Sequence, residues 1–242
     1  MENYDQYSFE ICENQTIEII RYSGSDEAVK IPGNIDGLPV TTIRKHAFAA
    51  TNVAEVIIPE GVETIETEAF AICDHLQRVT LPASLKKLGQ GVFKGSTELS
   101  QIVISEGNRH FSMYEGVLYC RDESALVFCP PGLKKETITV PIGVKIIASG
   151  AFFQNGHLKY VRLPISLEKI ETEAFLFTPL MKMIELPPKL KEIAPDSFLL
   201  IQGPAAEKPF TIYAFPDSVG YKYAVENKIP VRPLFTIATD YT

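Results

Sequence analysis

The side chains that most often carry out catalysis occur in this chain, but their spacing forms no catalytic set. No histidine stands at a metal-ligand spacing from another histidine, a cysteine or a carboxylate pair. The sequence also lacks a G-x-S-x-G motif, a phosphate-binding loop and an H-E-x-x-H motif. We therefore expect no enzyme activity, no bound metal and no cofactor. The histidines concerned are His46, His75, His110 and His157.

Carboxylates are numerous, and some of them recur in identical surroundings. The hexapeptide Ile65–Phe70 is repeated letter for letter as Ile170–Phe175, and each copy carries two glutamates. A glycosidase needs two such groups held at a defined separation in a buried site. We expect these glutamates on exposed loops instead, as solvated residues of a repeated structure: Glu66, Glu68, Glu171 and Glu173.

The repetition extends beyond this hexapeptide. An aliphatic residue, a branched aliphatic residue and a phenylalanine recur with one phase, and an apolar-proline step precedes them. This phase has a period of 22 or 23 residues, which is typical of a repeat protein. The longer interval between Phe93 and Phe152 indicates a degenerate repeat with an insertion of about 13 residues. The phenylalanines are predicted to be structural core: Phe48, Phe70, Phe93, Phe152, Phe175 and Phe198.

Each repeat has the pattern of one short strand followed by a return segment. Apolar residues alternate before the proline, as in Val79-x-Leu81, which favours a strand with one buried face. Proline then ends the strand because it has no N–H to donate. A unit of this length cannot bury its own apolar face, so we expect stacked units whose strands pair in parallel. The sequence thus predicts a β-rich, right-handed solenoid with loops and short helical turns on the return side.

This pattern resembles the bacterial leucine-rich repeats of the BspA-like type. Leu76–Pro82 followed by Leu85–Phe93 makes one complete unit, and the resemblance runs from about Val29 to Phe215. It implies a leucine-rich-repeat solenoid with a parallel β-sheet on its concave face. It also implies protein binding, often adhesion in surface-exposed members, on a fold that hosts no fixed catalytic set.

We expect one repeat domain over residues 1–242, since no linker interrupts the phase. Residues 1–28 are predicted to form an N-terminal cap, 29–215 about eight repeats, and 216–242 a C-terminal cap with a short helix after Ser218. A hairpin insertion is expected near 111–131. It would pair Gly116–Cys120 with Ala125–Cys129, which keeps Cys120 and Cys129 too far apart to bridge, so all four cysteines are expected as thiols.

The strand face exposes the residues four and two positions before each proline equivalent. In the last repeat these are Ile212 and Ala214. Much of this face fits a plain sheet surface, because it carries a β-branched ladder and neighbours of opposite charge. Tyrosine, arginine and methionine, however, are enriched in interface cores. The predicted binding residues on the concave face are Arg78, Gln101, Thr139, Tyr160, Arg162 and Met183; the inserted hairpin is a second candidate.

Charge and hydropathy limit the possible partners. The net charge of -7 and the pI near 5.2 argue against nucleic acid and anionic membranes. No apolar run approaches the length that spans a bilayer, so no membrane insertion is expected. The acidic N-terminus does not have the pattern of a signal peptide, which predicts a cytoplasmic protein as the sequence stands, or a surface or secreted one if the chain has been trimmed.

We therefore predict a non-catalytic protein-binding module that recognises a host or partner protein. If the protein is displayed on the cell surface, we expect it to act in adhesion. It is expected to be monomeric or weakly self-associating. The alternative is an intracellular structural or assembly scaffold with no adhesive role.

Overall fold

Short parallel strands dominate the computed structural model, which describes residues 4–122, 124–201 and 209–235. The chain divides into two compact units. Unit 1 contains the residues up to Arg121 together with Pro130–Leu133, and unit 2 contains Asp122–Cys129 and the residues from Lys134 onwards. The expectation of a single repeat domain stays a prediction.

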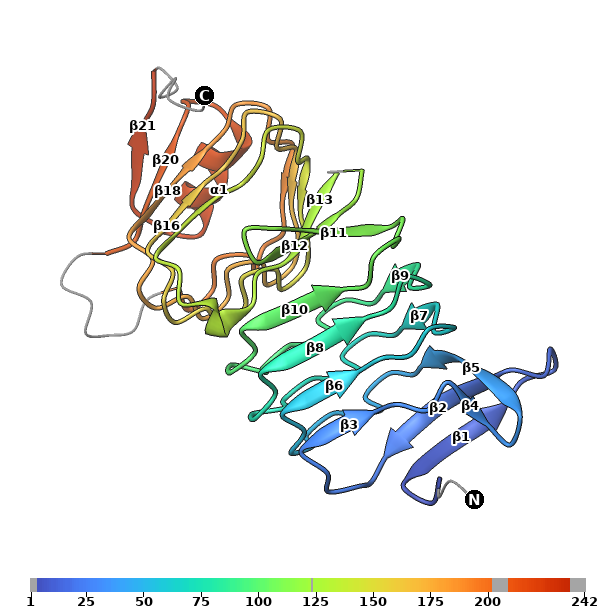
Figure 1. The fold of residues 1–242 in the computed structure, drawn as a ribbon. Helices are drawn as coiled ribbons and strands as arrows, with labels where there is room; N and C mark the ends of the chain where they lie inside the picture. The colour runs from blue at the N-terminus through green and yellow to red at the C-terminus, as the bar shows by residue number, and fades with distance from the viewer. Residues whose placement is uncertain (1–3, 123, 202–208, 236–242) are drawn as a thin grey trace. The chain divides into compact units, whose positions relative to one another are not determined.

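Unit 1 contains two sheets (Figure 1). The strands that precede the prolines form the parallel sheet β10-β8-β6-β3, and a second sheet has the order β1-β2-β5-β7-β9, with β4 paired to β5. A 3-10 helix at Pro131–Leu133 and the hairpin β11–β12 complete the unit. The bounds are β1 Tyr7–Ile11, β2 Ile17–Tyr22, β3 Ala28–Lys30, β4 Asn34–Ile35, β5 Leu38–Ile43, β6 Glu55–Ile57, β7 Thr64–Ile65, β8 Arg78–Leu81, β9 Lys87–Leu88, β10 Gln101–Ile104, β11 Phe111–Tyr114 and β12 Val117–Cys120.

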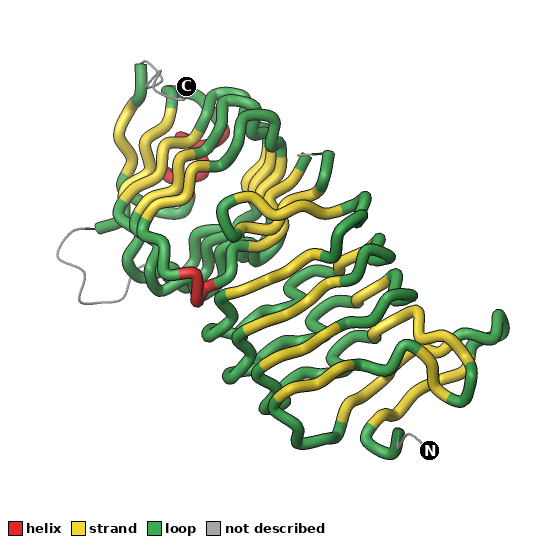
Figure 2. Tube along the Cα trace, in the orientation of Figure 1, coloured by secondary structure: helices red, strands yellow, loops and turns green. Residues whose placement is uncertain are grey.

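Unit 2 repeats this plan. The strands before the prolines form the parallel sheet β14-β16-β18-β20-β21, and β13, β15, β17 and β19 follow one another in a second parallel ladder. One helix, α1, covers the C-terminal end (Figure 2). The bounds are β13 Ala125–Phe128, β14 Thr137–Thr139, β15 Ile146–Ile147, β16 Tyr160–Arg162, β17 Lys169–Ile170, β18 Met183–Leu186, β19 Glu192–Ile193, β20 Thr211–Ala214, α1 Val219–Glu226 and β21 Val231–Pro233.

The return side is more regular than the sequence indicates. It carries a second ladder of two-residue strands, each ending at the branched aliphatic residue of its repeat, as at Ile65 and Ile170. The reason is that a coil of 22 or 23 residues places the same backbone groups at the same height in every turn. Hydrogen bonds therefore continue between coils past the strand, for example from Glu66 N–H to the Ile43 carbonyl.

Phenylalanines form the centre of the core in both units. In unit 1 the rings of Phe48, Phe70 and Phe93 stack with centroid separations of 4.9 and 5.9 Å. In unit 2 Phe152, Phe175 and Phe198 stack at 4.9 Å per step. All six side chains are buried. Their shared spacing thus places one ring of each coil directly on the ring of the next, which adds specific aromatic contact to the burial of apolar area.

Five of the six phenylalanines lie between two residues in the left-handed region of backbone conformation, whereas Phe198 has one such residue, Leu200, on its later side. These residues stand two positions before and two positions after the ring, as Gly91 and Gly95 do around Phe93. Glycine adopts this conformation without strain. Ile72 and Phe177 occupy the later position in other coils with φ of 57° each. A β-branched residue such as Ile72 is strained there.

Tyrosines close both phenylalanine stacks. In the N-terminal hairpin, Tyr22 stacks on Phe48 at 5.0 Å and Tyr7 packs against Tyr22 at 5.3 Å. At the other end, Tyr223 of α1 lies 5.8 Å from Phe198 and donates a hydrogen bond to the Pro195 carbonyl. The helix expected after Ser218 is present, and the Ser218 hydroxyl accepts the N–H of Tyr221. Residues 1–3 and 236–242 of the predicted caps lie outside the described residues.

The insertion contains an antiparallel hairpin, β11–β12, which turns at Glu115 and Gly116 with positive φ at both residues. This turn is the tight two-residue type that suits twisted strands. This hairpin precedes the predicted pairing of 116–120 with 125–129, whose two segments form the strands β12 and β13. The expected loop at 121–124 includes residue 123, which lies outside the described residues. All four cysteines are free thiols.

Candidate protein-interaction surface

The strand face of unit 2 presents two columns of side chains to solvent. Val161, Ile184 and Ile212 point inwards and are buried, so the residues on either side of each point outwards. Strand pairing aligns Thr137, Tyr160, Met183 and Thr211 in the first column. The register places Thr139, Arg162, Glu185, Tyr213 and Arg232 in the second column.

In the last of these repeats the predicted outward residues are wrong by one position. Ile212 and Ala214 are fully buried, and Thr211 and Tyr213 face outwards instead. The predicted positions were counted back from Pro216. In the structure Ala214 pairs with Leu186, the residue before Pro187, so Phe215 occupies the place of a strand-ending proline. The alternation of Phe210, Ile212 and Ala214 contains the correct register, since these three side chains share the buried face. Tyr213 and Arg232 were missed for this reason.

Cationic and aromatic groups meet on this face. The ammonium of Lys182 stands 5.9 Å from the centroid of the Tyr160 ring, within the range of a cation–π contact. Arg162 and Arg232 are exposed, and neither forms an ion pair with any residue in the part of the chain that the structure describes. Glu185 is the neighbour of Arg162 in the second column but forms no ion pair with it. Both guanidinium groups are available to a partner.

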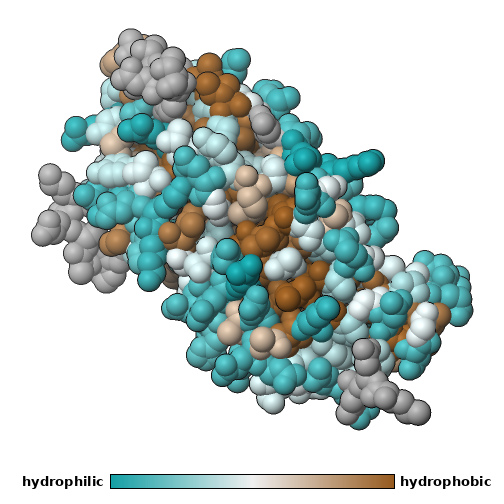
Figure 3. Space-filling view, viewed as in Figure 1, coloured by the Kyte–Doolittle hydropathy of each residue, from teal (hydrophilic) through white to brown (hydrophobic). Residues whose placement is uncertain are grey.

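An apolar strip borders the second column, at the residues that follow the strand-ending prolines. Ile142 is 62% exposed and Ile165 is 45% exposed. Beside Ile165 is a small hollow of about 10 Å³ lined by Leu186, Phe215 and Leu234. Figure 3 shows one face of the molecule, on which hydrophobic residues reach the surface among hydrophilic ones. The hollow is too small for a ligand, but its walls are an apolar surface that a side chain can cover.

The strand face of unit 1 has the other two predicted residues. Gln101 pairs with Arg78 in the sheet, and Arg78 forms an ion pair with Glu55 at 3.5 Å. The second outward column begins with Lys30 and continues as the expected ladder of Ile57, Thr80 and Val103. The six predicted binding residues therefore fall into two groups: Arg78 and Gln101 in unit 1, and Thr139, Tyr160, Arg162 and Met183 in unit 2.

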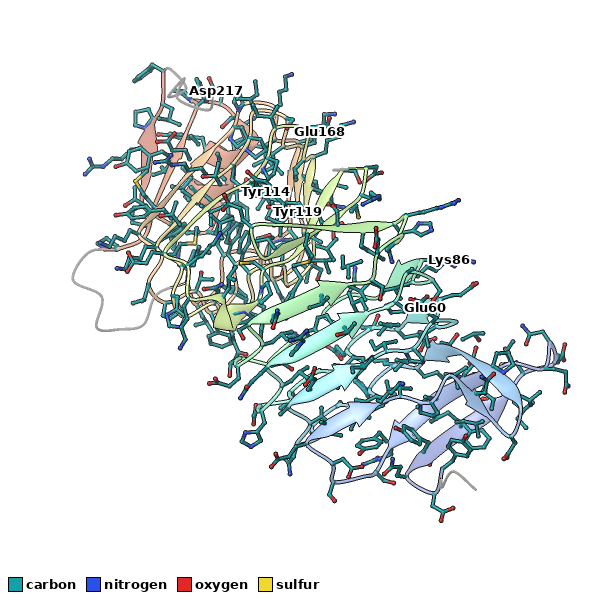
Figure 4. All side chains as sticks on the ribbon, viewed as in Figure 1. Glu60, Lys86, Tyr114, Tyr119, Glu168 and Asp217 are labelled. Carbon is teal, nitrogen blue, oxygen red and sulfur yellow. The ribbon has the colours of Figure 1, made fainter. Side chains whose placement is uncertain are left out.

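The hairpin, the second candidate, presents an aromatic pair within unit 1. The rings of Tyr114 and Tyr119 lie 6.4 Å apart at an edge-on angle (Figure 4). Tyr119 is buried, and Tyr114 is 53% exposed. One exposed ring is a smaller contact area than the strand face of unit 2 offers.

The repeated glutamates serve the contacts between coils. Glu66 accepts the backbone N–H of Lys45, and Glu171 accepts that of Ser149. Glu68 bonds to the His46 ring at 2.7 Å, and this hydrogen bond lowers the pKa of the Glu68 carboxyl. These carboxylates are engaged in structure on the return side, where the sequence analysis placed solvated loops.

Several buried polar side chains are likewise satisfied within the fold, whereas the buried Oε1 of Gln154 has no hydrogen-bond partner among the described residues. Cys73 and Ser96 are buried, and both hydrogen-bond to backbone carbonyls of the preceding coil. Asn108 donates to two carbonyls and accepts two backbone N–H groups. Among the described residues no three histidine, cysteine or carboxylate side chains are grouped as metal ligands. The larger open hollow, about 470 Å³ beside Tyr4, Lys30 and Pro32 in unit 1, holds no such group of ligands.

Comparison with known proteins identifies the repeat. The family model of the BspA type leucine rich repeat region matches residues 41–132 and 127–202, in six copies. This match covers more than half of the chain. The chain belongs to this family.

Solved structures of bacterial leucine-rich repeat proteins share the fold. The pneumococcal vaccine antigen PcpA is 20% identical, with a TM-score of 0.52 over 84% of this chain and 73% of PcpA. A leucine rich cell surface protein from Faecalibacterium prausnitzii is 25% identical, with a TM-score of 0.53 over 88% of this chain and 54% of that protein. A leucine-rich repeat protein from Bacteroides ovatus is 20% identical, with a TM-score of 0.53 over 95% of this chain and 66% of its own length.

These comparisons show a leucine-rich-repeat solenoid, and proteins on this scaffold are typically binding modules without catalytic activity. No curated protein matches the chain. None of the helices in the described ranges is long and apolar enough to cross a bilayer.

Proposed function

We propose that this protein is a non-catalytic recognition module that binds a partner protein through the strand face of unit 2. The observation that carries the proposal is the group of Tyr160, Arg162, Met183 and Tyr213 on neighbouring strands, with the arginine unpaired among the described residues. Aromatic rings, methionine and arginine are the types that interfaces concentrate at their centres. A rigid sheet holds them in place, so little order has to be gained on binding.

The contrast with unit 1 supports this choice of face. There the arginine is already paired with Glu55, and the rest of the outward surface carries Ala28, Lys30, Gln101 and a β-branched ladder, with no aromatic ring and no methionine. A paired surface arginine adds little to a new contact, since the existing pair must be broken first.

Affinity capture with matched variants tests the proposal. The protein is immobilised and exposed to extract and culture medium of the source cells, next to the double variant Tyr160→Ala/Met183→Ala and the control variant Arg78→Ala/Gln101→Ala. We expect a protein retained by the wild type and the control but lost from the double variant. Retention by all three would place binding elsewhere, and unchanged circular dichroism must show that the variants remain folded.

The leucine-rich cell surface protein of Faecalibacterium prausnitzii supports a surface-displayed partner over a cytoplasmic one. Protease treatment of intact source cells, followed by detection of the chain with an antibody, separates the two. Loss of the antibody signal after protease treatment supports adhesion. Protection of the chain from the protease supports the alternative of an intracellular scaffold. In that case light scattering on the purified chain should reveal self-assembly.

A further inference from the structure

The cations on the strand face of unit 2 contrast with the charge of the whole chain. The chain has a net charge of -7. Yet Arg162, Arg232 and Lys182 are exposed around this face, with Glu185 as the acidic residue of the second column. The two arginines form no ion pair with a described residue. A local positive field selects an acidic partner, whereas face-to-face contact of two copies of this surface would bring like charges together.

The two arginines are separated across the sheet. Arg162 lies in β16 and Arg232 in β21, with β18 and β20 between them. Three strand-to-strand steps amount to about 14 Å. An extended chain covers that distance in about four residues. A partner segment that runs across the strands can therefore place one carboxylate at each arginine when its acidic residues are about four positions apart.

Apolar surface lies between and beside the cations. Tyr213 stands between Glu185 and Arg232 in the same column, and Met183 neighbours Tyr160 in the other. The exposed Ile165 and the small hollow lined by Phe215 and Leu234 border the second column. A sulfated glycan or another polyanion offers nothing to cover this surface, and Glu185 repels it. A polypeptide that alternates acidic and apolar residues matches both features.

We propose that the partner docks an extended acidic segment across β16, β18, β20 and β21, with carboxylates at Arg162 and Arg232 and an apolar side chain over Ile165 and Phe215. This proposal rests on the proposed function of the face and adds the chemistry of the partner. It concerns one surface within unit 2.

Selection from a display library of short random peptides tests it. The immobilised bait is the full chain, and the same library is panned against the charge-reversed variant Arg162→Glu/Arg232→Glu and the unit 1 control Arg78→Glu. We expect peptides enriched in Asp and Glu at a spacing of about four residues, with apolar residues between them. The best peptide, made synthetically, should bind the charge-reversed variant roughly tenfold or more weakly and the control equally well. Its affinity should also fall as salt rises, and the double variant Arg162→Lys/Arg232→Lys should retain part of it.

Other outcomes overturn the proposal in distinguishable ways. Neutral or basic peptides that bind the charge-reversed variant equally but lose affinity for Tyr160→Ala/Met183→Ala would refute the acidic partner and leave the proposed function standing. Peptides indifferent to every variant of this face would refute both. Stronger binding of heparin than of any selected peptide, lost on charge reversal, would replace the polypeptide by a polyanion.

Discussion

The two units have cores of the same kind and differ at the edge that follows the strand-ending prolines. In unit 1, Glu60 follows Pro59, and its carboxylate accepts the backbone N–H groups of Ala83 and Ser84 in the next coil. In unit 2 the equivalent residue is Ile142, which is exposed. In the next coil the exposed apolar surface is again larger in unit 2, since Ile165 stands where unit 1 has Ala83. The same backbone can thus end a coil with a polar contact or with free apolar surface.

Contacts that do not vary between the units explain why this exchange is tolerated. Ser84 in unit 1 bonds to the Val62 carbonyl and accepts the N–H of Gly61. Ser166 makes the same two bonds in unit 2, to the Val144 carbonyl and from Gly143. The serine already joins the coils, so the residue after the proline is available for another role. In unit 2, next to two unpaired arginines, that role is recognition under our proposal.

The largest expected effect tests whether the two cores are equivalent. Phe70→Ala in unit 1 and Phe175→Ala in unit 2 each remove a buried ring stacked on both sides. Each should lower the free energy of unfolding by about 3–5 kcal/mol, measured by urea denaturation. Phe177→Ala, which removes a partly exposed ring, serves as the control and should cost much less. A loss confined to one unit would show that the stacks are not equivalent.

A second comparison concerns the fourth residue before the phenylalanine, which is Gly89 in unit 1 and Ala148 in unit 2. A Cβ added at Gly89 would come within 2.2 Å of the Thr67 backbone nitrogen, so the backbone must shift. We expect Gly89→Ala to destabilise the protein by about 1–3 kcal/mol in thermal or urea unfolding. The reverse change, Ala148→Gly, should cost no more than about 1 kcal/mol. Equal tolerance of both changes would mean that the two return ladders have the same geometry.

The tyrosine caps predict a loss of stability in alkali at both ends of the chain. Burial raises the pKa of Tyr7 and of Tyr223 from 10.0 to about 12. The unfolded chain therefore releases these protons first, so stability is full below pH 10 and falls as the pH rises towards 12. Burial of the Cys129 thiol, which raises its pKa from 9.0 to about 12, adds to the fall in unit 2 from pH 9 upwards.

Urea midpoints at a series of pH values measure this dependence. Tyr7→Phe and Tyr223→Phe remove one titrating group each and should flatten the decline between pH 10 and 12. A decline of unchanged slope in both variants would show that these phenols do not set the alkaline limit.

The smallest expected effect concerns backbone strain. Ile72 has a φ of 57° and is 59% exposed, whereas the equivalent residue of the next coil is Gly95. Ile72→Gly should therefore raise the free energy of unfolding by up to about 1 kcal/mol, because the release of strain exceeds the entropic cost of glycine. Phe177→Gly is the matched change in unit 2, but its ring contacts Phe153 at 6.1 Å, so we expect no gain there. A destabilised Ile72→Gly variant would contradict the strain assigned to Ile72.

The repeat and its fold family could be predicted because each relevant residue carries its own periodic signal. Phe70 and Phe175 lie in identical hexapeptides, and alternation such as Val79-x-Leu81 marks the buried side of a strand. The return ladder was missed because a strand of two residues, such as Thr64–Ile65, is too short to show a period. It exists through hydrogen bonds between coils, which no single repeat contains.

The candidate surface was predictable in unit 2 as far as the prolines marked the register. Tyr160, Arg162 and Met183 follow from Pro164 and Pro187. After β20 the proline lies one residue later than in the other repeats, because Phe215 stands at the usual proline position and Pro216 follows it. Counting back from Pro216 therefore does not find Tyr213. Arg232 could not be found by repeat counting, since β21 belongs to the cap and follows α1. The two units divide at and beside the predicted insertion near 111–131, within the long interval between Phe93 and Phe152.

The serine, glutamate and ring contacts between coils have a consequence for how such a chain can change in length. Every coil offers the next one the same backbone groups, and two coils share an identical hexapeptide. Removal or duplication of one whole coil of 23 residues therefore leaves matching surfaces on both sides of the junction. Length can then vary in steps of about 4.8 Å, one strand spacing each, while the tyrosine caps stay unchanged. A single coil added between β16 and β21 would increase the distance from Arg162 to Arg232 by one strand spacing. A partner that bridges the two arginines could then no longer contact both.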